Sequence, residues 1–321
     1  MKSPNKSLFT FLMVSSTYMV ASSSNWLMTW MGLEINMLGF IPLMFVKDNS
    51  SESQAAVKYL VPQSLGSTIF IASAIISTYF NNLQILMVIA MCLKLGVAPF
   101  HFWFPPVMAS LQLTPAFILL TWQKIAPILS ISSLNIFLIK TIMPIAVISA
   151  MWGGIGGLNQ TDIRSLLTYS SIGHTGWMLV SINANYMIFI SYLITYILIN
   201  SSIYSFLTKE HMKSHKQLFS SKEEMSSLIL AITILSLGGL PPFTGFIMKL
   251  LVLMFTEAKS MIILGLIMGA LTSLFYYLSL TFSTLLSISK IHLTKKQMIS
   301  KQTILFFLSQ TLPLTLTMYF F

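Results

Sequence analysis

The chain has 321 residues, of which 55% are hydrophobic and only 8% are charged, whereas an ordinary soluble domain is about 25% charged. Its apolar residues come in runs near or above 18, about the length that crosses a bilayer. The composition therefore excludes a soluble domain and predicts an integral membrane protein. The net charge of +10 would favour nucleic acid in a soluble protein, but here the lysines gather in loops, so no nucleic-acid partner is expected.

The apolar runs predict an all-α protein that forms a single membrane domain over residues 1–321. A run that is too long for one straight crossing, 225–256, contains Pro241-Pro242. Proline removes a backbone donor and clashes with the preceding turn, so two half-helices are expected there. In chain order we expect eleven helices, at 8–22, 26–46, 57–79, 84–98, 114–134, 141–156, 164–181, 187–207, 225–256, 261–289 and 303–321.

The loop charges test this arrangement. With alternating sides, most of the 18 lysines and arginines fall on the side of the N-terminus, and only Lys140 and Lys259 fall on the other side. An error of one helix would remove this asymmetry. The positive-inside rule then predicts an N-terminus in the cytoplasm or matrix and a C-terminus on the opposite side.

Two interruptions of the helices share a pattern, Gly-x-x-Pro-Phe, at 96–100 and 239–243. The two segments lie five helices apart, so they cross the membrane in opposite senses. This is the signature of inverted-topology repeats with broken helices, as in secondary transporters. We expect repeats at approximately 8–156 and 141–289, a C-terminal helix at 303–321, and broken helices around 96–106 and 238–242. The alternative is two unrelated kinks.

Four charged residues lie within the apolar helices: Glu34, Lys94, Lys124 and Lys249. An ionised group near the bilayer centre costs about 2.5–3.5 kcal/mol, so such groups face the bundle interior, pair, or contact water. Burial disfavours the charged form of lysine and of glutamate, which favours proton exchange near neutral pH. The four residues therefore predict a proton pathway. The alternatives are snorkelling of Lys94 or Lys249 to an interface, and a structural ion pair for Glu34 or Lys124.

Further residues of the chain are candidates for a functional or a structural role. His174, in mid-helix between small residues, suits either a proton relay or hydrogen-bonded packing, and His101 beside the first break is equally ambiguous. Asp162 at the start of a helix is expected to cap it. The glycine cluster 153–157 follows no strand, so close helix packing is expected and not a nucleotide loop. The single cysteine, Cys92, excludes a cluster held by several thiolates within this chain. The sequence has no metal-ligand spacing and no flavin or nicotinamide motif.

Six segments, in the same order as in a known family, resemble the antiporter-like subunits of respiratory complex I, specifically the NADH dehydrogenase subunit 2 family. They are 32–38 (GLEINML), 94–103 (KLGVAPFHFW), 120–127 (LTWQKIAP), 152–164, 169–172 (YSSI) and 237–245. One position departs from the family pattern, because Pro106 stands where the family carries an acidic residue.

The resemblance implies a core membrane subunit of NADH:ubiquinone oxidoreductase, with proton translocation coupled to electron transfer. It implies a Glu34–Lys94 pair followed by Lys124 and Lys249. NADH, FMN, iron–sulfur clusters and ubiquinone would belong to other subunits, so no cofactor is expected on this chain. The expected partners are other membrane-arm subunits and the bilayer, with cardiolipin as one candidate lipid. The expected location is the mitochondrial inner membrane, with the N-terminus in the matrix and the C-terminus toward the intermembrane space. A free-standing cation/proton antiporter and a structural scaffold are the alternatives.

Overall fold

A computed structural model describes residues 3–46, 49–77, 79, 84–134, 136–210, 214, 217, 224–256, 260–288, 306, 308, 310 and 311. These residues form helices, with one isolated β-bridge and no β-strand among them. The chain divides into two compact units, Met1–Ser149 and Ala150–Phe321.

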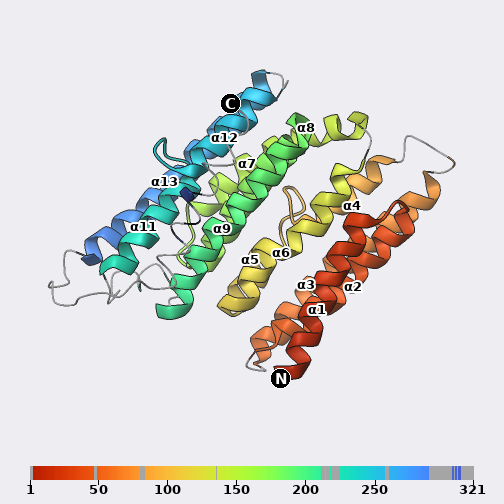
Figure 1. The fold of residues 1–321 in the computed structure, drawn as a ribbon, viewed down its shortest axis with the longest axis horizontal. Coiled ribbons are helices and arrows are strands. Elements are labelled where there is room, and N and C mark those ends of the chain that lie inside the picture. Colours follow the sequence, from red (N-terminus) through yellow and green to blue (C-terminus); the bar gives the residue numbers. More distant parts are fainter. Residues whose placement is uncertain are drawn as a thin grey trace. The chain divides into compact units, whose positions relative to one another are not determined.

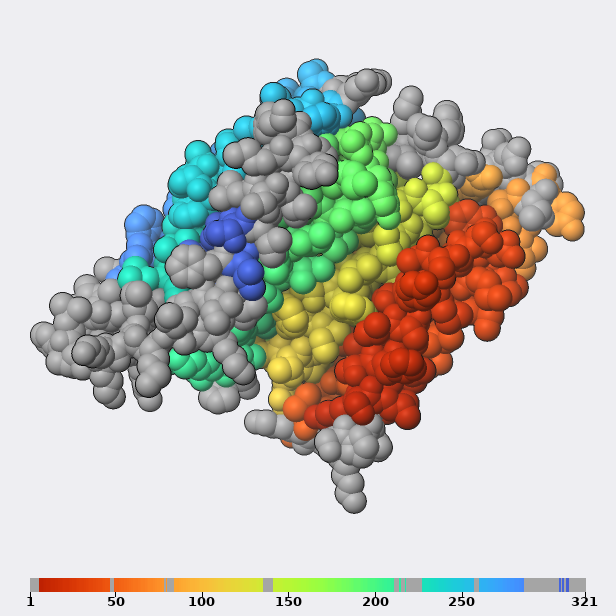
Figure 2. Space-filling view, viewed as in Figure 1, coloured from red at the N-terminus to blue at the C-terminus, as the bar shows by residue number. Residues whose placement is uncertain are grey.

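The N-terminal unit packs its helices largely in chain order. Its helices are α1 (Ser3–Ser22), α2 (Trp26–Met44), α3 (Ser50–Ile76), α4 (Ile85–Leu95), α5 (Phe104–Ser110) and α6 (Leu113–Ser132). Helix α1 lies beside α2, α2 beside α3 and α3 beside α4, while α6 contacts α1, α2 and α4 (Figure 1). The outer surface of α1, red in Figure 2, exposes apolar side chains such as Phe11 and Tyr18. Such a surface suits a lipid environment.

The C-terminal unit contains α8 (Ile163–Ala184), α9 (Tyr186–Glu210), α11 (Glu224–Gly238), α12 (Thr244–Phe255) and α13 (Ser260–Ile288). Helix α7 (Ile136–Gly157) begins in the first unit and ends in the second. Helix α8 runs beside α9, and α11 contacts both α9 and α13 (Figure 1). Helix α12 packs on α8 and α9.

Five helices among the described residues are long and apolar enough to span a membrane, and several shorter apolar helices accompany them. The all-α prediction is confirmed, whereas the number of eleven spans stays a prediction. Several boundaries differ from the sequence prediction: α1 begins at Ser3 and not at 8, α3 at Ser50 and not at 57, and α7 at Ile136 and not at 141. A short unpredicted helix, α5, follows the first break. The helix expected at 303–321 lies mostly outside the described residues.

The chain is interrupted at both Gly-x-x-Pro-Phe segments by the same backbone motif. Helix α4 ends before Gly96, whose φ is +66°, and α11 ends before Gly239, whose φ is +82°. Val97 N donates to Cys92 O at 3.1 Å, and in the second copy Leu240 N donates to Leu235 O at 3.4 Å. Both are Schellman motifs, in which a left-handed residue ends the helix and glycine carries no Cβ penalty. The shared cap supports the equivalence of the two breaks.

The glycine cluster 153–157 brings α7 close to its neighbours in the C-terminal unit. A Cβ on Gly153 would meet the backbone of Gly173 in α8, and one on Gly157 would meet the ring of Tyr276 in α13. The prediction of close packing is confirmed, because no larger residue fits these contacts without a shift.

Candidate functional site: buried lysines in two cavities

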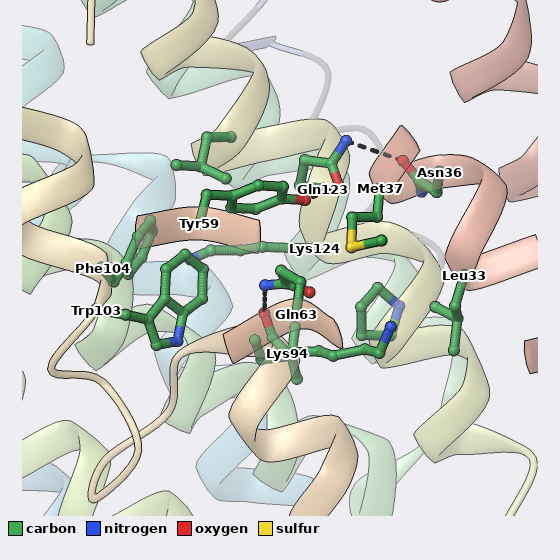
Figure 3. Close-up of a pocket in the computed structure, with 13 residues that line it drawn as sticks. Leu33, Asn36, Met37, Tyr59, Gln63, Lys94, Trp103, Phe104, Gln123 and Lys124 are labelled. Atoms are coloured by element: carbon green, nitrogen blue, oxygen red, sulfur yellow. Dashed lines mark hydrogen bonds between the residues drawn. The ribbon is translucent and has the colours of Figure 1, made fainter. Parts of the chain in front are cut away.

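Lys94 and Lys124 line one small cavity inside the N-terminal unit (Figure 3). The cavity leaves about 20 Å³ for the centres of water molecules, which is room for about one water. Only 5% of Lys94 and 4% of Lys124 is exposed, so neither lysine snorkels within this unit. Apolar, aromatic and polar residues share the lining of this cavity. They include Leu33, Tyr59, Trp103, Asn36, Gln63 and Gln123.

Lys94 extends toward α2 (Figure 3), where the charge of Glu34 acts on it through space. Among the described residues no ion pair joins Glu34 and Lys94 within 4.0 Å, so their attraction acts at longer range. The backbone carbonyl of Lys94 lies at the end of α4 and accepts a hydrogen bond from Gln63 Nε2 at 2.8 Å. Trp103 Nε1 donates to the carbonyl of Leu93 at 3.1 Å. Neutral donors thus satisfy the end of α4 and leave the Lys94 ammonium to face α2.

Lys124 points the other way, toward the ring of Phe104 (Figure 3), with its Nζ 5.8 Å from the ring centroid. The adjacent residue, Gln123, ties three helices together. Its Oε1 accepts a hydrogen bond from Tyr59 Oη at 3.1 Å, and its Nε2 donates to Asn36 Oδ1 at 2.9 Å. These bonds fix the rotation of α6 against α2 and α3, and therefore the direction in which Lys124 points.

The second site lies in the C-terminal unit, where Lys249 and His174 line one cavity. Lys249 Nζ donates to the carbonyl of Gly238, the last residue of α11, at 2.9 Å. This carbonyl belongs to the negative end of the helix dipole, which favours a cation. Lys249 Nζ also lies 5.9 Å from the centroid of Trp177. His174 Nδ1 is 2.9 Å from Tyr192 Oη, so the hydrogen-bonded packing expected as one alternative is present, and the ring borders the lysine's cavity as well.

Several polar partners escaped the sequence prediction. Glu52 is only 1% exposed, and its carboxylate accepts hydrogen bonds from Val46 N at 2.9 Å and from Gln112 Nε2 at 2.8 Å. It was missed because the predicted helix began at 57, which left Glu52 in a loop. The sequence did not indicate Gln63 and Gln123, because both side chains are neutral. A neutral amide in an apolar run does not stand out in the way that a charged residue does.

Asp162 corrects one expectation. It holds the N-cap position of α8, but its side chain makes no capping hydrogen bond. Its carboxylate instead acts on the nearby Arg164. His101 beside the first break is 3% exposed and stacks on Phe102 at 4.6 Å between ring centroids. No group of three or more His, Cys, Asp or Glu that could hold a metal ion occurs in the described part of the chain.

The arrangement suits proton exchange. In each unit a buried lysine borders a cavity that admits about one water and several hydrogen-bonding side chains. A lysine in such surroundings changes its protonation when a nearby charge moves, because the nearby charge is little screened there.

Broken helices and ionisable residues buried between them are typical of membrane transporters. The comparisons with known proteins agree with this class. Residues 23–276 match the model of the family described as NADH:quinone oxidoreductase/Mrp antiporter, TM. Among solved structures, the chain is similar to one from respiratory complex I of Thermus thermophilus with bound aureothin. Their TM-score is 0.80 and their identity 20%, over 98% of this chain and 79% of that one. It is also similar to a chain of the Mrp complex of Dietzia sp. (TM-score 0.73, 15% identity, 92% and 62% covered). The chain is thus an antiporter-type membrane protein.

Curated relatives narrow the class. NADH-ubiquinone oxidoreductase chain 2 of Lumbricus terrestris is 37% identical over 88% of this chain and 88% of its own length. The protein of the same name from Anopheles gambiae is 39% identical over 88% and 86%. The chain therefore belongs to the NADH-ubiquinone oxidoreductase chain 2 family.

Proposed function

We propose that the chain is a core membrane subunit of NADH:ubiquinone oxidoreductase in the mitochondrial inner membrane, and that it moves protons in response to electron transfer elsewhere in the complex. The observation that carries the proposal is that Lys94 and Lys124 line one buried cavity, and that the charge of Glu34 acts on Lys94. In the other unit, Lys249 and His174 line a second cavity. Isolated buried charges would be costly without such a role.

In the proposed mechanism, charge movement drives the protons. While the Glu34 carboxylate faces Lys94, it favours the protonated ammonium. When this attraction weakens, Lys94 releases its proton to water in the cavity, and Lys124 is the next acceptor in the same unit. Lys249 and His174 act in the same way in the C-terminal unit. The redox centres belong to other subunits. The expected partners of this chain are other membrane-arm subunits and the surrounding lipid, with cardiolipin as one candidate.

The finer architecture belongs to the same proposal. The matched caps at Gly96 and Gly239 support inverted repeats at approximately 8–156 and 141–289 within one membrane domain. Eleven spans would place the N-terminus in the matrix and the C-terminus toward the intermembrane space. The lysine-rich loops support this orientation.

Membership in the complex is tested by native electrophoresis of solubilised mitochondrial membranes, followed by staining for NADH dehydrogenase activity and immunodetection of this chain. We expect the chain to migrate with the stained band of high mass. Migration only as a small independent species would favour a free-standing cation/proton antiporter.

A further inference from the structure

An open cavity of about 440 Å³ lies at the turn between α7 and α8, in the C-terminal unit. Its lining includes Leu158 and Thr161, which are exposed, together with Gln160, Ser279 and Tyr276. The exposed members place its mouth at the protein surface. Tyr276, whose side chain is only 2% exposed, forms part of the wall of this cavity.

The adjacent residue, Tyr277, faces the inner cavity that holds Lys249 and His174. Consecutive residues on a helix point about 100° apart. The two neighbouring tyrosines of α13 can therefore line two different cavities, Tyr276 the open one and Tyr277 the inner one. Their ring centroids are 4.6 Å apart. Tyr277 is 1% exposed and interacts with Tyr276 and Ser170, and Ser170 also borders the inner cavity.

Both phenolic oxygens are buried. The side chain of Tyr276 interacts with Tyr277 and Ser273, and that of Tyr277 interacts with Tyr276 and Ser170. Water in the open cavity and water in the inner cavity would extend this row of hydroxyl groups on its two sides. A tyrosine hydroxyl both donates and accepts, so each can join two such waters into one hydrogen-bonded chain.

We propose that Tyr276 and Tyr277 form the proton passage between the open cavity at the α7–α8 turn and the inner cavity of Lys249 and His174. In each transfer, the phenolic oxygen accepts a proton from the outer side while its own proton passes to the inner side. The number of protons on each tyrosine is unchanged after the step, and no charge remains on the ring. Gly157, on which the Tyr276 ring packs, holds that ring at the inner end of the open cavity.

This inference rests on the proposed function, since it supplies the route by which protons reach Lys249. It is tested in membrane vesicles that carry the assembled complex, by measuring NADH-driven proton translocation for Tyr276→Phe and Tyr277→Phe. Each change removes one oxygen and keeps the ring. We expect translocation to fall by roughly tenfold for Tyr277→Phe. This is less than the roughly 10²–10⁴-fold contribution of a positioned acid or base, because water can replace part of a hydroxyl's role. Tyr276→Phe should reduce it in the same direction.

Tyr204→Phe is the matched control, because Tyr204 is buried in the same unit, at 3% exposure, and lines neither of the two cavities. Native electrophoresis normalises each result to the amount of assembled complex. If Tyr276→Phe and Tyr277→Phe both behave like Tyr204→Phe while Lys249→Met abolishes translocation, the passage is wrong and the proposed function stands. If Lys249→Met also translocates normally, the role of Lys249 in the proposed function fails instead.

Discussion

The two broken helices satisfy their last carbonyls in different ways. The end of α4 accepts hydrogen bonds from the neutral side chains of Gln63 and Trp103, whereas the end of α11 accepts one from the ammonium of Lys249. Lys94 is therefore free to respond to Glu34, while Lys249 is held by a helix end. A proton that leaves Lys249 removes the charged donor to Gly238, so the protonation of this lysine and the stability of the second break are linked.

Glu34→Gln keeps the shape of the side chain and removes the charge that acts on Lys94. We expect proton translocation per assembled complex to fall by about tenfold, the effect of roughly 1.4 kcal/mol, with the amount of complex nearly unchanged. The measurement is NADH-driven acidification or alkalinisation in vesicles, normalised by native electrophoresis.

Glu52→Gln provides the contrast, because the Glu52 carboxylate accepts hydrogen bonds from an amide and a peptide N–H. It should lower the amount of assembled complex, through a loss of about 1–3 kcal/mol when a buried group loses its partners, and leave translocation per complex intact.

The outcome that contradicts the first of these two predictions is wild-type translocation in Glu34→Gln. It would remove Glu34 from the pathway.

At the scale of the helices, the sequence predicts much of the fold for a simple physical reason. Long apolar runs have to be helices in a membrane. The two Gly-x-x-Pro-Phe segments predict where these helices are interrupted. The start of α3 could not be predicted in this way, because Ser50 to Gln54 are polar and yet helical. The polar contacts of Gln63 and Gln123 were equally hidden, since a neutral amide in an apolar run says nothing about the helix that it will meet.

The contact between α7 and α8 gives a test with a built-in control. A Cβ at Gly153 would collide with the backbone of Gly173, whereas a Cβ at Gly173 has only Ala150 O near it, at 3.9 Å. Gly153→Ala should therefore destabilise the protein by about 1–3 kcal/mol through overpacking. Gly173→Ala should be neutral or stabilising by up to about 1 kcal/mol, through helix propensity.

The measurement for this pair is the fraction of complex that survives a series of temperatures, read by native electrophoresis. Equal losses for Gly153→Ala and Gly173→Ala would contradict the described packing of α7 on α8.

At the scale of the whole molecule, each compact unit carries its own buried lysine site. The sequence identified the lysines, because charges inside apolar runs are conspicuous. It did not reveal that Lys94 and Lys124 share one cavity, because that depends on the packing of α4 against α6. Two sites of one kind agree with the proposed repeats and with a protein that transfers protons without redox chemistry of its own.

The proposed function is tested most directly by the number of protons translocated per NADH oxidised, in vesicles carrying the assembled complex. Lys124→Met and Lys249→Met remove a buried ammonium, and Lys58→Met removes an exposed lysine of α3 as the control. We predict a lower ratio for each buried lysine and an unchanged ratio for Lys58→Met. A wild-type ratio in both Lys124→Met and Lys249→Met would show that these charges only hold the helices together.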